Sequence, residues 1–335
     1  MNSFGRIFRV SIFGESHGEN VGVVIDGCPA GISLIKEDFS PDLERRKAGA
    51  KGTTPRKEDD VPEIVSGVFN NKTTGAPITI LFKNSNTRSA DYEKQRAVPR
   101  PGHADFVASK KFNGFQDYRG GGHFSGRLTV ALVAAGVVAK KCLLLTSSGG
   151  GGIRVESKIL EIGGETDLDK GLQKAIDAKD SIGGIIECRV NGLPIGLGEP
   201  FFDSAESLIS HAVFAIPAVR AIEFGTGFAA AKMFGSKHND AIEDASGKTK
   251  TNHAGGVVGG LTNGNELVFR IAIKPTSSTP QEQQTLNIET NKVEPFSVKG
   301  RHDLCIALRV PVVLEAATAI VLADLMLLAQ KISTK

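Results

Sequence analysis

An apolar run without proline, Leu128 to Leu145, constrains the fold of this chain more than any other feature of its sequence. Its length and composition predict a buried helix. A second apolar run, Val312 to Gln330, is interrupted by Glu315 and Asp324. Because charged side chains are costly inside a bilayer, this run predicts another buried helix rather than a membrane span. We therefore expect core helices and no association with a membrane.

Shorter segments predict a mixed α/β fold. Segments rich in β-branched and aromatic residues predict strands at 7–13, 22–26, 64–68, 78–82, 185–190, 219–224 and 267–273, with a further short strand after Cys305. Further helices are predicted at 36–47, 168–178 and 204–214. The first two strands should form a hairpin, and so should the next two. No clean βαβ period appears and no G-x-G-x-x-G motif follows a strand, so a Rossmann domain is not expected.

The length of 335 residues allows one large domain or two ordinary ones. A serine and glycine stretch at 147–152 is the candidate boundary between two domains. Motifs with polar, chemically useful side chains lie on both sides of this stretch. We therefore expect a single domain over residues 1–335, whose halves share one site.

Composition argues against several classes of protein. Hydrophobic residues make up 40% of the chain and charged residues 23%, which predicts a globular core rather than disorder. A net charge of +3, no tryptophan and two tyrosines argue against a nucleic-acid binder. The four cysteines are scattered without a C-x-x-C pair, and the N-terminus lacks the apolar core of a signal peptide. Reduced thiols in a cytoplasmic protein are therefore expected, and no metal site.

The segment before the first apolar run, Arg119 to Thr129, reads RGGGHFSGRLT. Its three adjacent glycines lack a Cβ, so backbone can approach a ligand closely there. His123, Ser125 and Arg127 add three polar groups next to an expected helix N-terminus, which suits an anion. The glycines alone would be explained by a tight turn before a buried helix. Together with the polar groups, they favour a binding site.

Other polar residues also stand in turns. The motif GESHG carries Ser16 and His17, and RPGHAD carries Arg100 and His103. The remaining groups are Arg46, Lys274 with the hydroxyls of KPTSS, Arg301 and Asp303. Taken singly, these are equally explained as solvated or capped turns. Their sum is strongly cationic, with histidines suited to proton transfer, which predicts an enzyme acting on a small, phosphorylated, multiply anionic substrate by elimination or transfer.

Nine motifs in order resemble those of the chorismate synthase family and run from the N-terminus to Asp303. They are FRVSIFGESHG, RRKAG, RPGHAD, DYRGGGHFSGR, DSIGG, GLGEP, NHAGG, KPTSS and GRHD. The resemblance implies an α/β sandwich with helices between antiparallel sheets, assembled as a homotetramer. It also implies an anti-1,4-elimination of phosphate from 5-enolpyruvylshikimate 3-phosphate, giving chorismate in the shikimate pathway. The implied cofactor is reduced FMN, and the source of its electrons stays open between NADPH and a separate flavin reductase.

The same resemblance assigns roles to residues. It implies that His17 protonates the reduced flavin, that His103 lies near the leaving phosphate, and that Asp303 is the acid/base partner of a flavin ring nitrogen. Ser16 and Ser125 would support this proton relay. The implied flavin contacts are His123, Phe124, Ser125, Pro217, Ala218, Gly259, Lys274, Pro275, Thr276, Ser277, Ser278 and Arg301. The implied substrate-binding arginines are Arg46, Arg100 and Arg127.

Some residues depart from the family pattern. Many members read GGGRSSARET where this chain reads GGGHFSGRLT, so that His123 and Phe124 replace an arginine and a serine. Gly52 stands where members often have an arginine, within the loop 48–60 that we expect to cover the substrate. Two alternatives stay open: a flavin-dependent reductase using the same cationic pocket, and a homologue that binds flavin or anions without catalysis.

Overall fold

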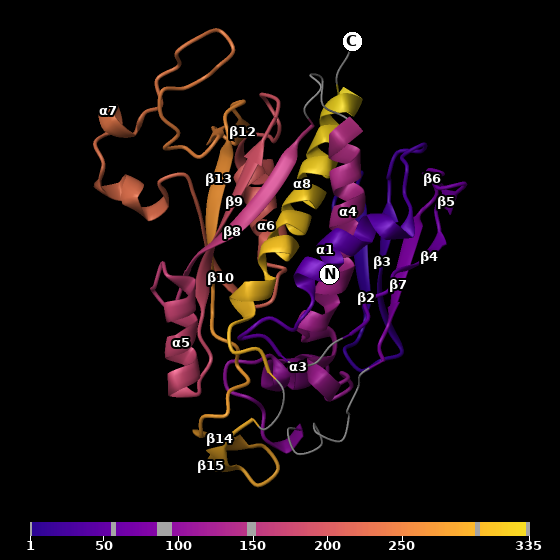
Figure 1. The fold of residues 1–335 in the computed structure, drawn as a ribbon, viewed down its shortest axis with the longest axis vertical. Helices are drawn as coiled ribbons and strands as arrows, with labels where there is room; N and C mark the ends of the chain where they lie inside the picture. The colour runs from indigo at the N-terminus through magenta and orange to yellow at the C-terminus, as the bar shows by residue number, and fades with distance from the viewer. Residues whose placement is uncertain (1, 55–57, 86–95, 146–151, 299–301, 333–335) are drawn as a thin grey trace.

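Two antiparallel sheets enclose a pair of long helices in this computed structural model, which describes residues 2–54, 58–85, 96–145, 152–298 and 302–332 (Figure 1). Within these residues, the first sheet has the strand order β1-β2-β3-β7-β4, formed by Ser3–Phe4, Arg9–Gly14, Asn20–Asp26, Ile78–Lys83 and Glu63–Ser66. The second has the order β10-β13-β9-β8, formed by Val219–Phe224, Leu267–Ile273, Gly184–Asn191 and Arg154–Ile162. The expected α/β sandwich with helices between antiparallel sheets is confirmed.

The two central helices are α4, Thr129–Leu145, and α8, Pro311–Ile332. They pack against each other, α4 facing the first sheet and α8 the second (Figure 1). Gly136 permits their close approach, because a Cβ at this position would lie only 2.3 Å from the Cβ of Ala316. Both helices are long and apolar enough to cross a membrane, but most of their residues are buried inside the protein. They are core helices, as the sequence predicts.

The two carboxylates that interrupt the apolar sequence of α8 both have partners. Glu315 accepts hydrogen bonds from Arg45 and Lys140, which come from α1 (Ser40–Arg46) and α4. Asp324 accepts bonds from three successive backbone N–H groups, those of residues 6–8. Because a buried carboxylate without such donors would be costly, these contacts explain how α8 tolerates charge in the core.

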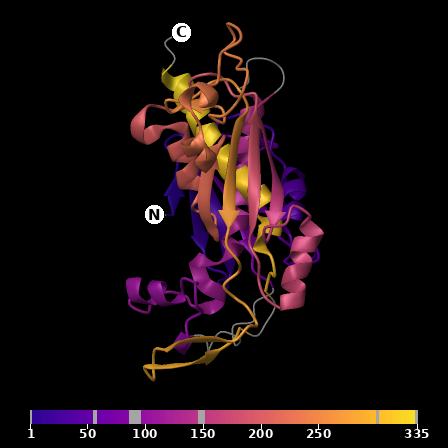
Figure 2. The same ribbon diagram turned by 90° about the vertical axis from the view of Figure 1, so that its left-hand side faces the viewer.

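The remaining elements lie around this sandwich. The other helices are η1 Lys36–Phe39, α3 Asp105–Lys111, η3 Arg119–Phe124, η4 Gly126–Leu128, α5 Leu168–Ala178, η5 Phe201–Asp203, α6 Ala205–Val213, η6 Gly227–Lys232, α7 Gly235–His238 and η7 Ile306–Arg309. Three small hairpins are β5 Val68–Phe69 with β6 Lys72–Thr73, β11 Val257–Val258 with β12 Leu261–Thr262, and β14 Gln283–Asn287 with β15 Lys292–Phe296. The last of these projects from one end of the molecule (Figure 2).

Most of the predicted elements are confirmed, with a few corrections. The expected strand after Cys305 is wrong, because residues Ile306–Arg309 form the 3-10 helix η7. The predicted hairpin of 64–68 and 78–82 exists, but the small β5–β6 hairpin is inserted between its strands. The expected boundary at 147–152 lies outside the described residues except for Gly152.

Candidate active site

A cavity of about 670 Å³ is lined by residues of both halves of the chain. Many of the predicted site residues line it, namely Arg46, Arg100, His103, His123, Phe124, Ser125, Arg127, Pro217, Ala218, residues 274–278 and Asp303. The structure thus brings together motifs that are more than 250 positions apart in the sequence, counted from Arg46 to Asp303. Two other predicted residues, Ser16 and His17, do not line the cavity but lie directly behind its glycine-rich wall.

The glycine-rich wall is shaped by three residues with positive φ. Gly120, Gly121 and Gly122 have φ values of +59°, +83° and +52°. A Cβ at Gly120 would lie 2.5 Å from the His17 ring, and one at Gly121 would lie 3.1 Å from the His103 ring. Both the backbone conformation and the close approach of two imidazoles therefore require glycine here. The predicted role of these glycines in a site has this physical basis.

Arg100 and His103 share one carboxylate, that of Asp105. Arg100 donates from Nε and Nη2 to Asp105 at 2.7 and 2.8 Å, and the His103 Nδ1 lies 2.5 Å from Asp105 Oδ1. Burial alone would raise the pKa of Asp105, but the bonds from Arg100 and His103 outweigh it and hold this pKa well below its usual value. Arg100 also donates to Ser278 Oγ at 3.1 Å. Asp105 is a residue that the sequence analysis missed, although it stands in the RPGHAD motif.

Lys274 and Ser277 lie on the same side of the site as Gly102. The Lys274 ammonium donates to Ser277 Oγ at 2.6 Å and to the Gly102 carbonyl at 3.1 Å. Burial, with a smaller contribution from Arg220, lowers the pKa of Lys274. The KPTSS motif therefore contacts the RPGHAD motif directly. These contacts connect the end of β13 in the second sheet with the turn before α3.

The Asp303 carboxylate accepts hydrogen bonds from two donors, one that precedes it in the sequence and one that follows it. Arg309 Nη1 donates to its Oδ2 at 3.1 Å, and the Thr54 backbone N–H donates to its Oδ1 at 2.9 Å. The Gly52 carbonyl accepts bonds from the backbone N–H groups of Leu304 and Cys305. The described part of the expected cover, loop 48–60, is thus tied to Asp303, while residues 55–57 lie outside the described residues. Arg309 is a second residue that the sequence analysis missed.

The departure at Gly52 has a structural correlate. Its φ is +87°, and a Cβ there would lie 2.5 Å from Leu172 Cδ1. An arginine at this position would therefore strain the backbone and require the Leu172 side chain to move. The loop contributes only backbone atoms to its contacts with residues 303–305, so the glycine does not prevent these contacts.

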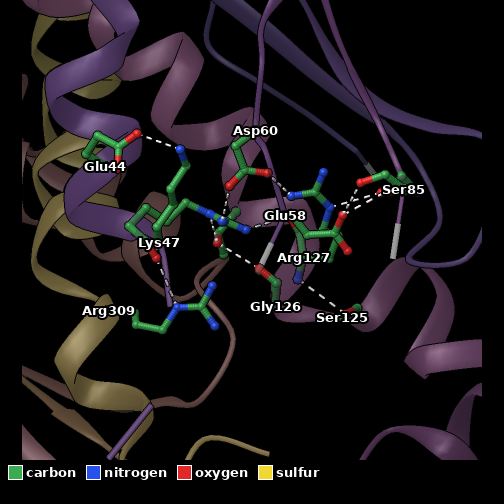
Figure 3. Close-up of polar contacts among 12 residues, drawn as sticks. Glu44, Lys47, Glu58, Asp60, Ser85, Ser125, Gly126, Arg127 and Arg309 are labelled. Carbon is green, nitrogen blue, oxygen red and sulfur yellow. Dashed lines mark hydrogen bonds and ion pairs between the residues drawn. The ribbon is translucent and has the colours of Figure 1, made fainter. Parts of the chain in front are cut away.

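Arg46 and Arg127, the remaining predicted arginines, meet at Asp60. Arg46 Nη1 donates to Asp60 Oδ2 at 3.0 Å, and Arg127 Nη1 donates to Asp60 Oδ1 (Figure 3). Burial lowers the pKa of Arg46 to about 9, an effect that Asp60 opposes. Asp60 is the third missed residue. No signal in the sequence distinguishes it from Asp59, because the pairing depends on how the chain folds back between positions 46 and 127.

The other predicted flavin contacts are only partly gathered here. His123 Nδ1 lies 2.8 Å from the Gly14 carbonyl oxygen, and Phe124 packs near Phe112 with ring centroids 6.3 Å apart. Gly259 lies in the β11–β12 turn and is not part of the cavity lining. Arg301 lies outside the described residues. No cluster of three or more potential metal ligands occurs in the described ranges.

One wall of the cavity is apolar. It is formed by side chains from the first sheet and the central helices, including Phe4, Ile12, Leu132, Val313 and Ala317, and by Ile216, which follows α6. The lining also includes the arginines, His103 and Asp303. A cavity with both apolar and cationic lining suits a ligand with a flat apolar face together with a small anion.

Comparisons with known proteins agree on one family. A family model described as chorismate synthase matches residues 8–327. The chain is 72% identical to the chorismate synthase of Chitinophaga pinensis over 331 residues, which cover 99% of this chain and 98% of that protein. It is 44% identical to that of Dehalococcoides mccartyi, covering 97% and 96% of the two chains. A solved structure titled "Crystal Structure of Chorismate Synthase" matches with a TM-score of 0.73 at 27% identity, covering 98% of this chain and 94% of the other.

Proposed function

The chain belongs to the chorismate synthase family, and we propose how its cavity performs that family's reaction. The protein is a carbon–oxygen lyase that eliminates phosphate. The proposed substrate is 5-enolpyruvylshikimate 3-phosphate, which loses phosphate and a ring hydrogen in an anti-1,4-elimination to give chorismate. The observation that carries this proposal is the excess of cationic side chains over carboxylates around one cavity, which also holds a histidine and an aspartate suited to proton transfer.

The substrate has two carboxylates and a phosphate, and Arg46, Arg100 and Arg127 are the proposed partners of these groups. A guanidinium matches a carboxylate or a phosphate through two parallel hydrogen bonds. All three arginines are buried and line the cavity, so their bonds to an anion would form away from bulk water. Each is already held by other contacts, which reduces the entropy lost when the substrate is oriented.

We propose that different residues of the lining transfer the proton and stabilise the leaving group. Arg100 and His103, fixed by Asp105, would stabilise the negative charge of the departing phosphate. Asp303, held by Arg309 and the Thr54 N–H, would accept and return a proton through its carboxylate. Ser16 and His17 lie behind Gly120, where only the glycine backbone separates them from the cavity. We propose that these residues, with Ser125, complete the relay.

The cavity fits a flavin as the family's cofactor. Its apolar wall suits the flat ring system, and Pro217, Ala218, His123 and residues 274–278 would hold the polar edge and the phosphate chain. When bound, reduced FMN supplies electron density to the substrate as phosphate leaves. Gly259 and Arg301 remain proposed contacts by resemblance alone. The electrons come either from NADPH or from a separate flavin reductase, and NADPH oxidation by the purified protein with FMN distinguishes the two sources.

We also propose that the chain acts as one domain in a cytoplasmic homotetramer. Five phenylalanines are more than 80% exposed in the single chain, which supports burial against other subunits: Phe115, Phe201, Phe202, Phe228 and Phe234. The four cysteines are free, which supports a reducing compartment. Sedimentation equilibrium tests the assembly: a monomer at micromolar concentration would contradict it.

An anaerobic assay tests the proposed reaction. The protein is mixed with 5-enolpyruvylshikimate 3-phosphate and chemically reduced FMN, and phosphate and chorismate are measured together. We expect equal amounts of both, with the flavin still reduced at the end. In a parallel reaction with NADPH and FMN, net oxidation of NADPH without chorismate would indicate a flavin-dependent reductase. Substrate binding without either product in the anaerobic assay would indicate a non-catalytic homologue.

A further inference from the structure

Asp60 joins two arginines of the cavity wall through a single carboxylate. Figure 3 labels Asp60 and one of these arginines, Arg127. One oxygen accepts from Arg46 and the other from Arg127. The three side chains are at most 5% exposed. A carboxylate that uses one oxygen for each cation fixes both, because neither guanidinium can turn without losing its charge-assisted bond.

Further contacts hold the same two guanidinium groups in place. Arg46 donates from Nε to Thr129 Oγ1 at 3.1 Å and from Nη2 to the Arg127 carbonyl oxygen at 3.0 Å. Arg127 donates from Nε to Asn84 Oδ1 at 2.9 Å. Arg127 also donates from Nη2 to the Lys83 carbonyl oxygen at 3.4 Å. A guanidinium has five N–H bonds, and contacts with described residues use three of them on Arg46 and three on Arg127. Donors therefore remain for an anion in the cavity that both arginines line.

The charge of Asp60 matters as much as its shape. Arg46 is surrounded by the cations Arg127 and Arg309, and by the carboxylates of Asp60 and Asp303. Asp60 is the strongest of the charges that favour the protonated form of Arg46. Without it, two buried guanidinium groups would lie close together with no carboxylate between them, and their repulsion would separate them.

The backbone of Asp60 is also unusual. Its φ is +50°, in the left-handed region that residues other than glycine rarely adopt. Such a conformation persists where surrounding contacts determine it, and residues of this kind gather at binding sites. Here the two buried ion pairs supply those contacts. Asp59, which directly precedes it, is exposed instead.

We propose that Asp60 is a positioning residue for substrate binding, which sets the spacing and orientation of Arg46 and Arg127 so that their free donors meet an anionic group of the substrate. This inference rests on the proposed function, in which these two arginines bind the substrate. If Asp60 has this role, removing its negative charge weakens the binding of an anionic substrate. A simple count of charges would predict tighter binding instead.

The test compares D60N with D59N, which removes the same charge from an exposed neighbouring position. We expect D60N to raise KM for 5-enolpyruvylshikimate 3-phosphate at least tenfold while kcat and the affinity for FMN change less than threefold. D59N should leave all three within twofold of the wild-type protein. A purely structural role would instead lower the melting temperature and the amount of active enzyme, without a selective change in KM. An unchanged or lower KM in folded D60N overturns the proposal.

Two more variants keep the test decisive. If D60N does not fold, D60E retains the charge but displaces both guanidinium groups, and it should still raise KM at least fivefold. R127M shows whether the arginines bind the substrate at all. A normal KM in R127M contradicts the proposed function, whereas a raised KM in R127M beside a normal KM in D60N and D60E contradicts the role of Asp60 alone. In D60N/R127M, the increase in KM should be smaller than the product of the two single increases.

Discussion

Two adjacent arginines of helix α1 enter different ion-pair clusters. Arg45 donates from Nη1 and Nη2 to Glu315 of α8 at 2.7 and 2.6 Å. Arg46 faces the cavity and is paired with Asp60. The pKa of Arg45 is raised, chiefly by its hydrogen bond to Glu315, whereas burial lowers that of Arg46 to about 9. The pKa shifts of these two adjacent arginines therefore have opposite directions.

The two clusters differ in their balance of charge. The core cluster pairs Arg45 and Lys140 with the carboxylates of Asp42 and Glu315, so its charges cancel. At the cavity, the single carboxylate of Asp60 pairs with two arginines, so this cluster has more positive than negative charges. A balanced cluster has no capacity left for a ligand and contributes to the packing of helices. A cluster with excess cations lacks a full set of partners until an anion arrives, which is the property of a binding site.

The largest expected difference is between methionine variants of the two arginines, because Arg46 should affect activity and Arg45 stability. We expect R46M to lower kcat/KM by about 10³-fold, because two charge-assisted hydrogen bonds to the substrate, each about 2 kcal/mol, would be lost. R45M should change kcat/KM less than threefold and lower the melting temperature instead. Steady-state phosphate release and thermal unfolding measure both. Equal losses of activity in the two variants would remove the distinction.

Glu315 tests the core cluster from its acidic side. Its side chain is 4% exposed, so E315Q should lower the free energy of unfolding by about 2 to 3 kcal/mol at pH 7. Burial alone would raise the pKa of Glu315, but Arg45 and Lys140 outweigh it and hold the pKa below its usual value. A depressed pKa stabilises the fold above the unfolded value of about 4.3, and this contribution is lost as the pH falls through the folded value.

The difference between E315Q and the wild-type protein should therefore narrow below about pH 4.3. Urea unfolding at a series of pH values measures it, and kcat/KM of the folded variant at pH 7 should stay near the wild-type value. A constant difference in stability down to pH 3 would mean that the charge of Glu315 is not what stabilises the fold.

Asp105, which pairs with two residues of the cavity lining, Arg100 and His103, offers a third variant. In D105N, Arg100 and His103 would lose the carboxylate that orients them both. We expect kcat to fall about tenfold, which corresponds to about 1.4 kcal/mol and to one weakened charge-assisted bond. FMN binding should be unchanged, because the apolar wall is not involved. A variant with normal kcat would indicate that Asp105 only stabilises the turn before α3.

The comparison of Arg45 with Arg46 also shows what the sequence could and could not predict. The two core helices follow from apolar composition, and the positions of Arg100 and His103 follow from a turn motif. Nothing in RRK tells which arginine faces the cavity, because two adjacent residues on a helix differ only by about 100° in direction. The sequence analysis missed Asp60 and Arg309 because their partners come from other segments of the chain. It missed Asp105 because an acidic residue beside Arg100 and His103 is also explained as a simple counter-charge.

Strand β8 was missed for a different reason. Its sequence, RVESKILEI, alternates at first, but a register shift between Ile159 and Glu161 interrupts the pattern. As the edge strand of its sheet, it also carries exposed charged residues, which weaken the apolar signal. The resemblance to a family does not depend on such periodicity, since motif residues are recognised by identity, and many of the residues that it assigns to the site line one cavity.

The smallest expected effect is that of salt, which should change KM through the cavity cluster and leave the melting temperature nearly unchanged. Raising the KCl concentration from about 0.05 to 0.5 M shortens the screening length several-fold, so long-range attraction of a multiply anionic substrate to the cavity weakens and KM should rise about threefold to tenfold. The charges of the core cluster cancel, so it attracts no anion from solution, and the melting temperature should move by no more than about 3 °C. R45M should show the same salt dependence of KM as the wild-type protein, because its charge belongs to the balanced cluster. If KM were independent of salt while the melting temperature fell steeply, the excess charge would reside in the core rather than at the cavity.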